Sequence, residues 1–395
     1  MSTITLQHLL DACSPGGASV LTSVTPLEPA AGPHASVAPA KFVSGSKSVF
    51  AYERRFWNGE TATAVLIDSK QSQNNRLEAA VSAAIADEDP VLTRTPRIEL
   101  RFEDGQVYND MDLPHRAFDG QIRAGTINGE PATAVQKYRE LRDSTVAHAR
   151  PLLERSPMTL LLGGWDASRK SHQGRYRSIL VGEIIGILAD QDGGPEANQS
   201  KRGGARIDPV GMRIDLGDKA RKAIADAQKH ELSASTHKSA SGKTGKASTL
   251  GLGGVPPSLE QLGGVTCQAI IRSHVLSFAA LRALRFDSPT PEGDVACRAL
   301  LAALALNGLA RSDAELLLRA NCDLVETGPA VVTLDRRYGQ KESFEPLSID
   351  QAQELLSVAI DNATQTANLT WDGSVLVVEG NPAILAAAAD DAQDD

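Results

Sequence analysis

Short apolar runs along this chain alternate with segments whose apolar residues recur at helical spacing. A short helix is expected over residues 1–12, and a strand that runs into a Pro/Gly loop is expected over 18–33. The clearest unit is the β run TATAVLIDS at 61–69, which leads into the helical pattern QSQNNRLEAAVSAAIAD at 71–87. The pattern therefore predicts a strand-to-helix unit whose turn is crowded with amide side chains.

Further apolar runs continue this mixture of strands and helices. Residues 97–110 alternate apolar and polar positions around Asp104-Gly105, which is typical of a hairpin. Residues 158–165, MTLLLGGW, predict a buried strand that ends in a Gly-Gly turn, and an ordered pattern returns at 263–286. The other expected elements are helices over 134–156, 293–310 and 348–362 and strands over 175–189, 314–325, 367–371 and 374–380.

Residues 191–254 differ in composition from the rest of the chain. They are rich in Gly, Ser, Lys and Ala and contain few large apolar residues. Because such segments behave as flexible coils, we expect mobile loops inserted into a folded body. Elsewhere strands and helices mix without the regular alternation of a doubly wound sheet. The chain is therefore predicted to be α+β with a largely antiparallel sheet.

Composition and charge narrow the classes of function. The formal net charge of −9 argues against a generic nucleic-acid-binding protein. Residues 200–250, however, hold eleven Lys and Arg against five Asp and Glu, a local charge of +6. The four cysteines lie far apart, which favours free thiols in a reducing compartment over a zinc knuckle. Without a signal-peptide pattern or an apolar run of about 18 residues, we expect a cytoplasmic protein with no membrane partner.

The fragment Gly242-Lys243-Thr244 ends as a phosphate-binding P-loop ends. The P-loop pattern requires a glycine at position 237, where this chain has His237. No apolar strand precedes the fragment and no apolar helix follows it, although a phosphate cradle needs both. The sequence therefore favours a flexible basic loop over a nucleotide-hydrolysing enzyme that uses Lys243 and Thr244. It also contains no GxSxG or HExxH pattern, and we expect no cofactor, no metal and no catalytic residue.

Clusters of cationic and amide side chains border the predicted strands. Lys and Arg supply charge for phosphates, and amides and hydroxyls add neutral donors to phosphate and sugar. Arg272 and His274 alternate along one predicted strand and so share a face. Because only 4% of the residues are aromatic, tracking of a single-stranded backbone is favoured over base stacking on a row of aromatic rings. The candidate nucleic-acid-binding residues are Lys47, Lys70, Gln71, Ser72, Asn74, Asn75, Arg76, Arg169, Lys170, Arg175, Arg177, Lys201, Arg202, Arg206, Lys243, Lys246, Arg272 and His274.

An ordered set of segments carries a resemblance to a known family. The segments are LIDSKQSQNNRLE, RYRSILVGEIIGI, KRGGARIDPVGM and LGLGGVPPSLEQLGGVTCQAIIRSHVLSFAALRALRF. In this order, over roughly residues 18–340, the chain resembles the backbone subunit of the type I-G (formerly I-U) CRISPR Cascade complex, a RAMP-superfamily protein.

The resemblance implies a fold and a division of the chain. The fold would be a modified RRM or ferredoxin-like palm with an antiparallel sheet, helical finger insertions and a protruding thumb loop. Residues 1–190 would form the N-terminal part of the palm with a helical insertion, and residues 191–262 would form the flexible basic loop or thumb region. Residues 263–380 would complete the palm, and residues 381–395 would be a disordered acidic tail.

The resemblance also implies a function. The protein would be a non-catalytic CRISPR RNA-binding subunit, and its copies would stack along one guide. The residues at 70–76, 169–177 and 201–206 would hold the guide backbone. Its partners would be the guide RNA, a target DNA strand, copies of itself, and the large and guide-processing subunits of the complex. A metal-dependent RNA endonuclease of the same superfamily is the alternative.

Overall fold

The structure is a computed structural model that describes residues 2–45, 47–201, 216–252 and 262–384. The pattern of contacts divides the chain into two units. The larger unit comprises Met1–Asn198 and Val265–Gly380, and the smaller unit comprises Gln199–Gly264 and Asn381–Asp395.

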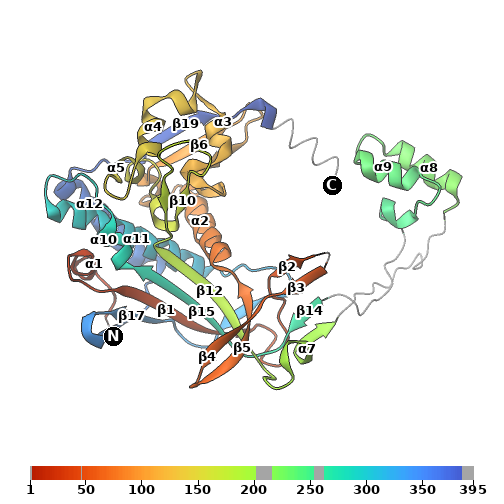
Figure 1. Cartoon of the computed structure of the whole chain (residues 1–395), viewed down its shortest axis with the longest axis horizontal. Helices are drawn as coiled ribbons and strands as arrows, with labels where there is room; N and C mark the ends of the chain where they lie inside the picture. Colours follow the sequence, from red (N-terminus) through yellow and green to blue (C-terminus); the bar gives the residue numbers. More distant parts are fainter. Residues whose placement is uncertain (1, 46, 202–215, 253–261, 385–395) are drawn as a thin grey trace. The chain divides into compact units, whose positions relative to one another are not determined.

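The larger unit is built on a sheet of eight strands within the described part of the chain (Figure 1). β16 (Leu324–Glu326) pairs with β1 beside the main path. The strands of this sheet pair antiparallel throughout its described part. The order along the path is β18 (Lys341–Phe344), β17 (Val331–Asp335), β1 (Val20–Pro29), β15 (Cys267–Ser277), β12 (Leu180–Leu188), β5 (Glu60–Asp68) and β4 (Tyr52–Trp57).

The centre of this sheet has the connectivity of a ferredoxin-like fold. In chain order the elements are β1, α2 (Lys70–Ala86), β12, β15, α11 (Pro291–Ala314) and β17. This is the β-α-β-β-α-β order of the split βαβ motif. β17, β1, β15 and β12 are neighbours in the sheet, and β4 and β5 extend it beyond β12.

The helices of the larger unit cover one face of the sheet (Figure 1). α11 is apolar around most of its circumference, as expected for a helix buried on all sides. By length and composition α11 could cross a membrane, but most of its apolar stretch is buried inside this unit. It packs against α2, α1 (Leu6–Cys13) and α12 (Ile349–Ala367), and α10 (Phe278–Ala283) precedes it. Gly308 permits the close approach of α2, because a Cβ there would lie 2.7 Å from Leu77 Cδ2.

An insertion between α2 and β12 forms a second layer at the end of the helices (Figure 1). Its small sheet has the order β7-β6-β19-β8-β9, and β19 (Val375–Glu379) returns from the C-terminal part of the chain to pair parallel with β6. The other elements are η1 (Leu92–Arg94), β6 (Arg97–Arg101), β7 (Val107–Asn109), η2 (Asp110–Asp112), η3 (Arg116–Phe118), α3 (Gly120–Ala124), β8 (Thr126–Ile127), β9 (Glu130–Pro131), η4 (Ala132–Ala134), α4 (Gln136–Asp143), α5 (Arg150–Leu153), α6 (Pro157–Leu162), β10 (Gly164–Trp165) and β11 (Arg175–Tyr176).

Short elements complete the two units. In the larger unit these are the hairpin β2 (Lys41–Ser44) and β3 (Lys47–Phe50), the turn η6 (Arg337–Gly339) and α7 (Gly194–Ala197). The smaller unit contains β13 (Gln199–Lys201), α8 (Asp218–Ala227), α9 (Ala234–Ser241), η5 (Ala247–Leu250) and most of β14 (Leu262–Val265), which pairs with β13.

The α+β class and the antiparallel sheet predicted from the sequence are confirmed. The strand-to-helix unit is present as β5 and α2, and the hairpin around Asp104-Gly105 is present as β6 and β7. The buried strand predicted over 158–165 is wrong, because α6 occupies most of it as a helix. Residues 314–325 and 367–371 are also mostly not strands. The segment predicted to be mobile loops contains the helices α8 and α9, and residues 385–395 lie outside the described residues.

Candidate nucleic-acid interface

Four of the predicted residues lie on the 164–177 hairpin, which comprises β10, β11, the loop between them and Arg177. Gly164 pairs with Tyr176, and Trp165 pairs with Arg175. The Tyr176 ring is buried and stacks on Phe118, with centroids 6.3 Å apart and an interplanar angle of 15°. This contact fixes the base of the hairpin to the core of the insertion.

A buried ion pair anchors the loop of the 164–177 hairpin. Arg142 donates from Nε to Asp166 Oδ2 at 2.8 Å and from Nη2 to Asp166 Oδ1 at 3.0 Å. Arg169 donates to the Arg142 carbonyl at 2.8 Å and pairs with Asp143. Bidentate guanidinium–carboxylate contacts fix geometry as well as charge. The loop therefore has a defined shape before any ligand arrives.

The outer surface of the 164–177 hairpin is cationic and carries an aromatic ring. Lys170, Arg175 and Arg177 are exposed. Trp165 is 52% exposed, and the Arg175 guanidinium carbon lies 5.2 Å from its ring centroid. This is the geometry of a cation–π contact. Exposed charge beside an exposed aromatic face can hold a phosphate and a base together.

The amide-rich junction at 70–76 is divided between exposed residues and residues that turn inward. Its hub is Asp68, which is fully buried and accepts hydrogen bonds from Ser72 Oγ at 2.9 Å and Gln73 Nε2 at 2.6 Å. Arg76 Nε lies 3.0 Å from one Asp68 oxygen, and Arg319 Nη2 lies 2.6 Å from the other.

These contacts decide the charge state of the hub and the availability of the junction. Burial alone would raise the Asp68 pKa, but the hydrogen bonds from Arg76, Gln73 and Ser72 outweigh it and the pKa is lowered. Asn74 is buried as well, so it is not available to a ligand in this structure. Of the predicted residues in this segment, Lys70, Gln71 and Asn75 are exposed.

A second cationic group lies on the sheet beside β12. Glu183 of β12 forms ion pairs with two cations. Its Oε1 lies 2.9 Å from Arg55 Nη1, and its Oε2 lies 3.9 Å from Lys70 Nζ. The Lys70 side chain is 57% exposed. Glu183 lies six residues after Arg177, a span of roughly 20 Å in extended chain. β12 thus connects the 164–177 hairpin to Lys70 and Arg55.

The prediction that Arg272 and His274 face nucleic acid does not fit their positions. They share one face of β15, as their spacing predicts, but that face is the one covered by helices. The His274 ring fills the space beside Gly182, where a Cβ would lie 2.0 Å from His274 Cδ2. Burial, with a contribution from Arg272, lowers the His274 pKa to about 3. His274 is a neutral, enclosed imidazole, and Arg272 is buried as well. Both residues therefore belong to the core and not to the interface.

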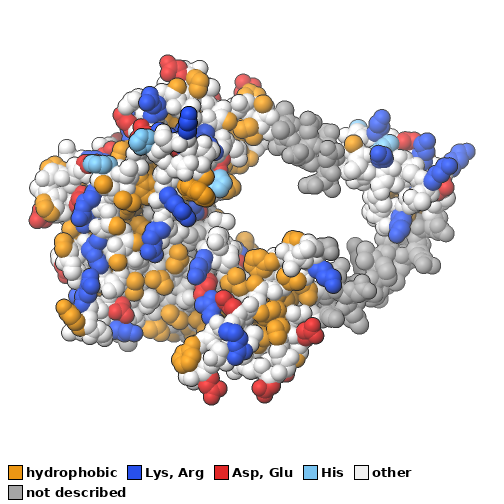
Figure 2. Space-filling model, viewed as in Figure 1, with side chains coloured by type: hydrophobic (Ala, Val, Ile, Leu, Met, Phe, Trp, Pro, Cys, Tyr) orange, Lys and Arg blue, Asp and Glu red, His pale blue; other side chains and the backbone are white. Residues whose placement is uncertain are grey.

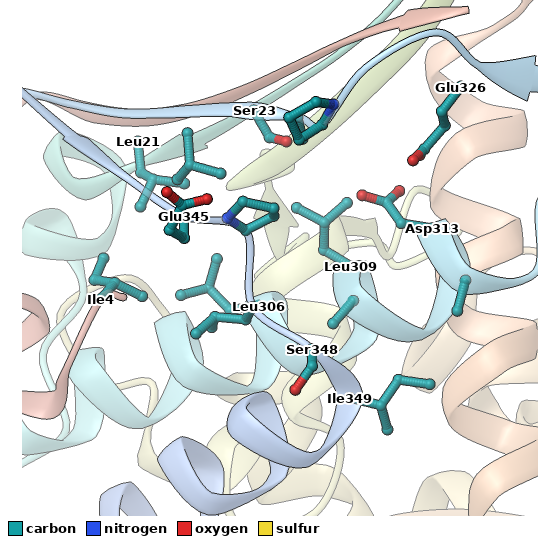
Figure 3. Close-up of a pocket in the computed structure, with 17 residues that line it drawn as sticks. Ile4, Leu21, Ser23, Leu306, Leu309, Asp313, Glu326, Glu345, Ser348 and Ile349 are labelled. Carbon is teal, nitrogen blue, oxygen red and sulfur yellow. The ribbon is translucent and has the colours of Figure 1, made fainter. Parts of the chain in front are cut away.

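A pocket of about 450 Å³ lies between the sheet and α11, and Asp313 and Glu326 are among the residues that line it (Figure 3). Both carboxylates are partners of Arg272. Its guanidinium lies 2.7 Å from Glu326 Oε1 and 3.4 Å from Asp313 Oδ1. Burial raises the Asp313 pKa to about 6. The rest of the lining is mainly apolar, including Leu21 and Leu309 (Figure 3). Among the residues that the structure describes, no group of three His, Cys, Asp or Glu side chains is placed to hold a metal ion.

The smaller unit presents lysines from the helices α8 and α9 and from the turns that follow them. Arg221 of α8 is buried, and it donates to the carbonyls of Ala240 at 2.8 Å and Gly242 at 2.6 Å at the end of α9. At Gly242-Lys243-Thr244, carbonyl oxygens therefore gather around a cation, whereas a P-loop directs N–H groups at an anion. The exposed lysines of this segment are Lys219 and Lys222 on α8, Lys238 on α9, and Lys229, Lys243 and Lys246 in the turns after these helices. Figure 2 shows cationic side chains on this part of the smaller unit.

The remaining predicted residues are placed as follows. Lys47 is exposed at the start of β3. Arg202 and Arg206 lie outside the described residues, as does the side chain of Lys201.

Sequence reasoning missed two features of this interface. The sequence pattern places Trp165 only at the end of a predicted strand, although an aromatic residue beside a basic stretch is a usable signal. The Asp68 hub includes Arg319, which lies 251 positions away, and no local pattern connects the two.

Comparison with known proteins relates part of this chain to a protein family. Residues 21–191 match the family model CRISPR-associated protein GSU0053 (Cas_GSU0053). The match covers less than half of the chain, from β1 through the 164–177 hairpin to the end of β12. No curated protein matches the chain. The matched segment, which includes both cationic groups of the interface, indicates a CRISPR-associated protein family.

Proposed function

We propose that this protein is a non-catalytic CRISPR RNA-binding backbone subunit of a type I-G Cascade complex. Its copies would assemble along one guide RNA and support pairing of the guide with a target DNA strand. The large subunit and the guide-processing subunit of the complex would be its other protein partners.

The single observation that carries the proposal is the 164–177 hairpin. Of its exposed cations, Arg175 lies on β11, Arg177 directly follows β11 and Lys170 lies in the loop, which the buried Arg142–Asp166 pair fixes. Charges that are already positioned lose little conformational entropy when they meet a phosphate. The match to a CRISPR-associated family over the same residues supports guide RNA as the ligand.

The 216–252 segment comprises α8, α9, η5 and the turns between them, and its lysines supply a second cationic surface. The described segment holds seven Lys and Arg and three Asp and Glu, a local charge of 7 − 3 = +4. We propose that this surface contacts the guide or a neighbouring copy, in the role that the resemblance assigns to a thumb.

Binding of single-stranded RNA at several salt concentrations tests the proposal. If each protomer neutralises about four phosphates, log K against log salt has a slope of roughly −3. The double variant Arg175→Ala/Arg177→Ala should lose more affinity than Lys243→Ala/Lys246→Ala, because its charges are anchored in the 164–177 hairpin. A flat salt response would contradict RNA binding. Cleavage of the RNA with Mg²⁺ by the protein alone would favour the endonuclease alternative.

A further inference from the structure

The turn between β17 and β18 presents a side chain that packs against none of the described residues. Tyr338 is 99% exposed. Its backbone has φ 62° and ψ 31°, in the left-handed region, and the next residue, Gly339, has φ 74°. Gln340 N donates to the Arg337 carbonyl at 3.3 Å and so closes the turn.

Two successive positive φ values are what a type I′ hairpin turn requires. The chain contains two other hairpins with this combination. Asn58 (φ 50°) and Gly59 (φ 88°) join β4 to β5, and Asn128 (φ 50°) and Gly129 (φ 78°) join β8 to β9. Both use Asn-Gly, the pair that adopts this turn most readily. Only the β17–β18 turn places a bulky side chain at the first position.

The tyrosine is therefore not explained by the fold. A side chain larger than Asn or Gly is disfavoured in the left-handed region. Burial of the Tyr338 ring does not offset this conformational cost, because the ring is almost wholly exposed to solvent. Neither burial nor a contact with another described residue accounts for the ring.

The charges around Tyr338 indicate the class of that molecule. Arg337 is exposed, and among the described residues it forms no ion pair. Arg336 is paired with Glu342, with Nη2 at 2.6 Å from Oε2. Lys341 is exposed and lies opposite Asp335 in the register. An exposed aromatic ring next in sequence to an arginine without an ion pair among the described residues suits a base and its phosphate.

We propose that Tyr338 stacks on an unpaired nucleobase and that Arg337 contacts the adjoining phosphate. This site lies on a different edge of the main sheet from β4, at β18. The inference rests on the proposed nucleic-acid function and adds a base-stacking contact to it.

Photo-crosslinking to full-length protein tests the site. The probe is a single-stranded RNA that carries 5-iodouridine, and crosslinked peptides are identified by mass spectrometry. Crosslinks to the peptides of both Trp165 and Tyr338 are expected. A crosslink at Trp165 without one at Tyr338 would overturn the inference and leave the proposed function standing. Absence of both would contradict the two together.

Matched variants separate stacking from folding. Tyr338→Asn introduces a residue that tolerates the left-handed region, as Asn58 and Asn128 do, so its melting temperature should be at least that of the wild type. Its RNA affinity should fall about tenfold, the effect of losing one base stack. Tyr338→Phe keeps the ring and should change affinity less than twofold. Arg337→Ala should reduce the salt slope by about 0.7.

Two results would contradict stacking on a base. A lower melting temperature for Tyr338→Asn would show that the ring supports the fold. Unchanged RNA affinity together with loss of self-association in RNA-free protein would assign Tyr338 to a protein contact instead.

Discussion

The guanidinium carbon of Arg175 lies 5.2 Å from the ring centroid of Trp165, across two strands that pair these residues directly. The pair stands on a hairpin whose loop is held by a buried Arg142–Asp166 contact. One ring is thus presented to solvent together with a fixed positive charge. This relationship makes the 164–177 hairpin the most specific part of the interface and leads to the first prediction.

Replacing Trp165 should weaken RNA binding without weakening the fold. Trp165→Ala removes one stacking surface, so affinity for single-stranded RNA should fall about tenfold. Because the ring is 52% exposed, the free energy of unfolding should change by about 0.5 kcal/mol or less. Fluorescence anisotropy with labelled RNA measures the affinity, and Trp165→Phe is the control that keeps a ring. Equal affinities for wild type and Trp165→Ala would remove the ring from the interface.

Gly182 should not tolerate a side chain. An added Cβ would lie 2.0 Å from His274 Cδ2, so Gly182→Ala forces the imidazole out of its site. We expect a destabilisation of about 1–3 kcal/mol, typical of overpacking. Chemical denaturation measures it. The double variant Gly182→Ala/His274→Ala removes the clash, so the effect of Gly182→Ala should be smaller in that background. Independent, additive effects would show that the two groups do not compete for space.

His274 should make the protein less stable as the pH falls. Its folded-state pKa is about 3, below the ordinary value of 6.5, so the unfolded chain binds the proton more readily. Stability is therefore complete above pH 6.5 and is lost as the pH falls towards 3. Between pH 7 and pH 5 the loss from this group is about 2 kcal/mol.

Other buried groups act in the opposite direction over part of this range, so His274 must be isolated by a variant. Burial raises the pKa of Glu78 to about 7 and that of Asp110 to about 6. Because the folded state binds these protons more readily than the unfolded chain, the two carboxyl groups make the folded protein more stable as the pH falls. The stability of His274→Gln relative to wild type should therefore rise by about 2 kcal/mol from pH 7 to pH 5. A pH-independent difference would show that His274 takes up a proton in the folded state.

Asp68 should be a major determinant of stability rather than of RNA binding. Asp68→Asn leaves Arg76 and Arg319 without their carboxylate. Breaking a fully buried pair costs 3–5 kcal/mol, and these arginines are 24% and 29% exposed, so we expect about 2 kcal/mol. Thermal unfolding measures the change. RNA affinity of the folded variant should match the wild type, and a selective loss of affinity would return this junction to the interface.

Arg221 should hold the end of α9 in place. Arg221→Gln shortens the side chain and removes the charge that the carbonyls of Ala240 and Gly242 receive. Amide hydrogen exchange in α9 should accelerate, because local opening no longer has to break these bonds. Exchange in α2 of the same sample is the internal control and should not change. Unaltered protection of α9 would mean that the helical hairpin of the smaller unit is held by other contacts.

The sequence by itself determined the type and location of the main elements. The β5–α2 unit, β12, β15 and α11 could all be recognised from apolar periodicity, and their mixture gave the α+β class. The 169–177 cationic run was also recognisable, since a concentration of charge before an apolar strand is a local property. Family resemblance could be read from the same ordered segments.

Only the tertiary structure decided which way the functional side chains point. A period of two places Arg272 and His274 on one face of β15, but it cannot say which face the helices cover. Asp68 turns Ser72, Gln73 and Arg76 inward, and its partner Arg319 is remote in sequence. The short apolar run at 158–165 is a helix because neighbouring segments bury it, which periodicity alone cannot reveal in so few residues. Burial and charge pairing arise from contacts between distant segments, and those contacts separated core groups from exposed ones here.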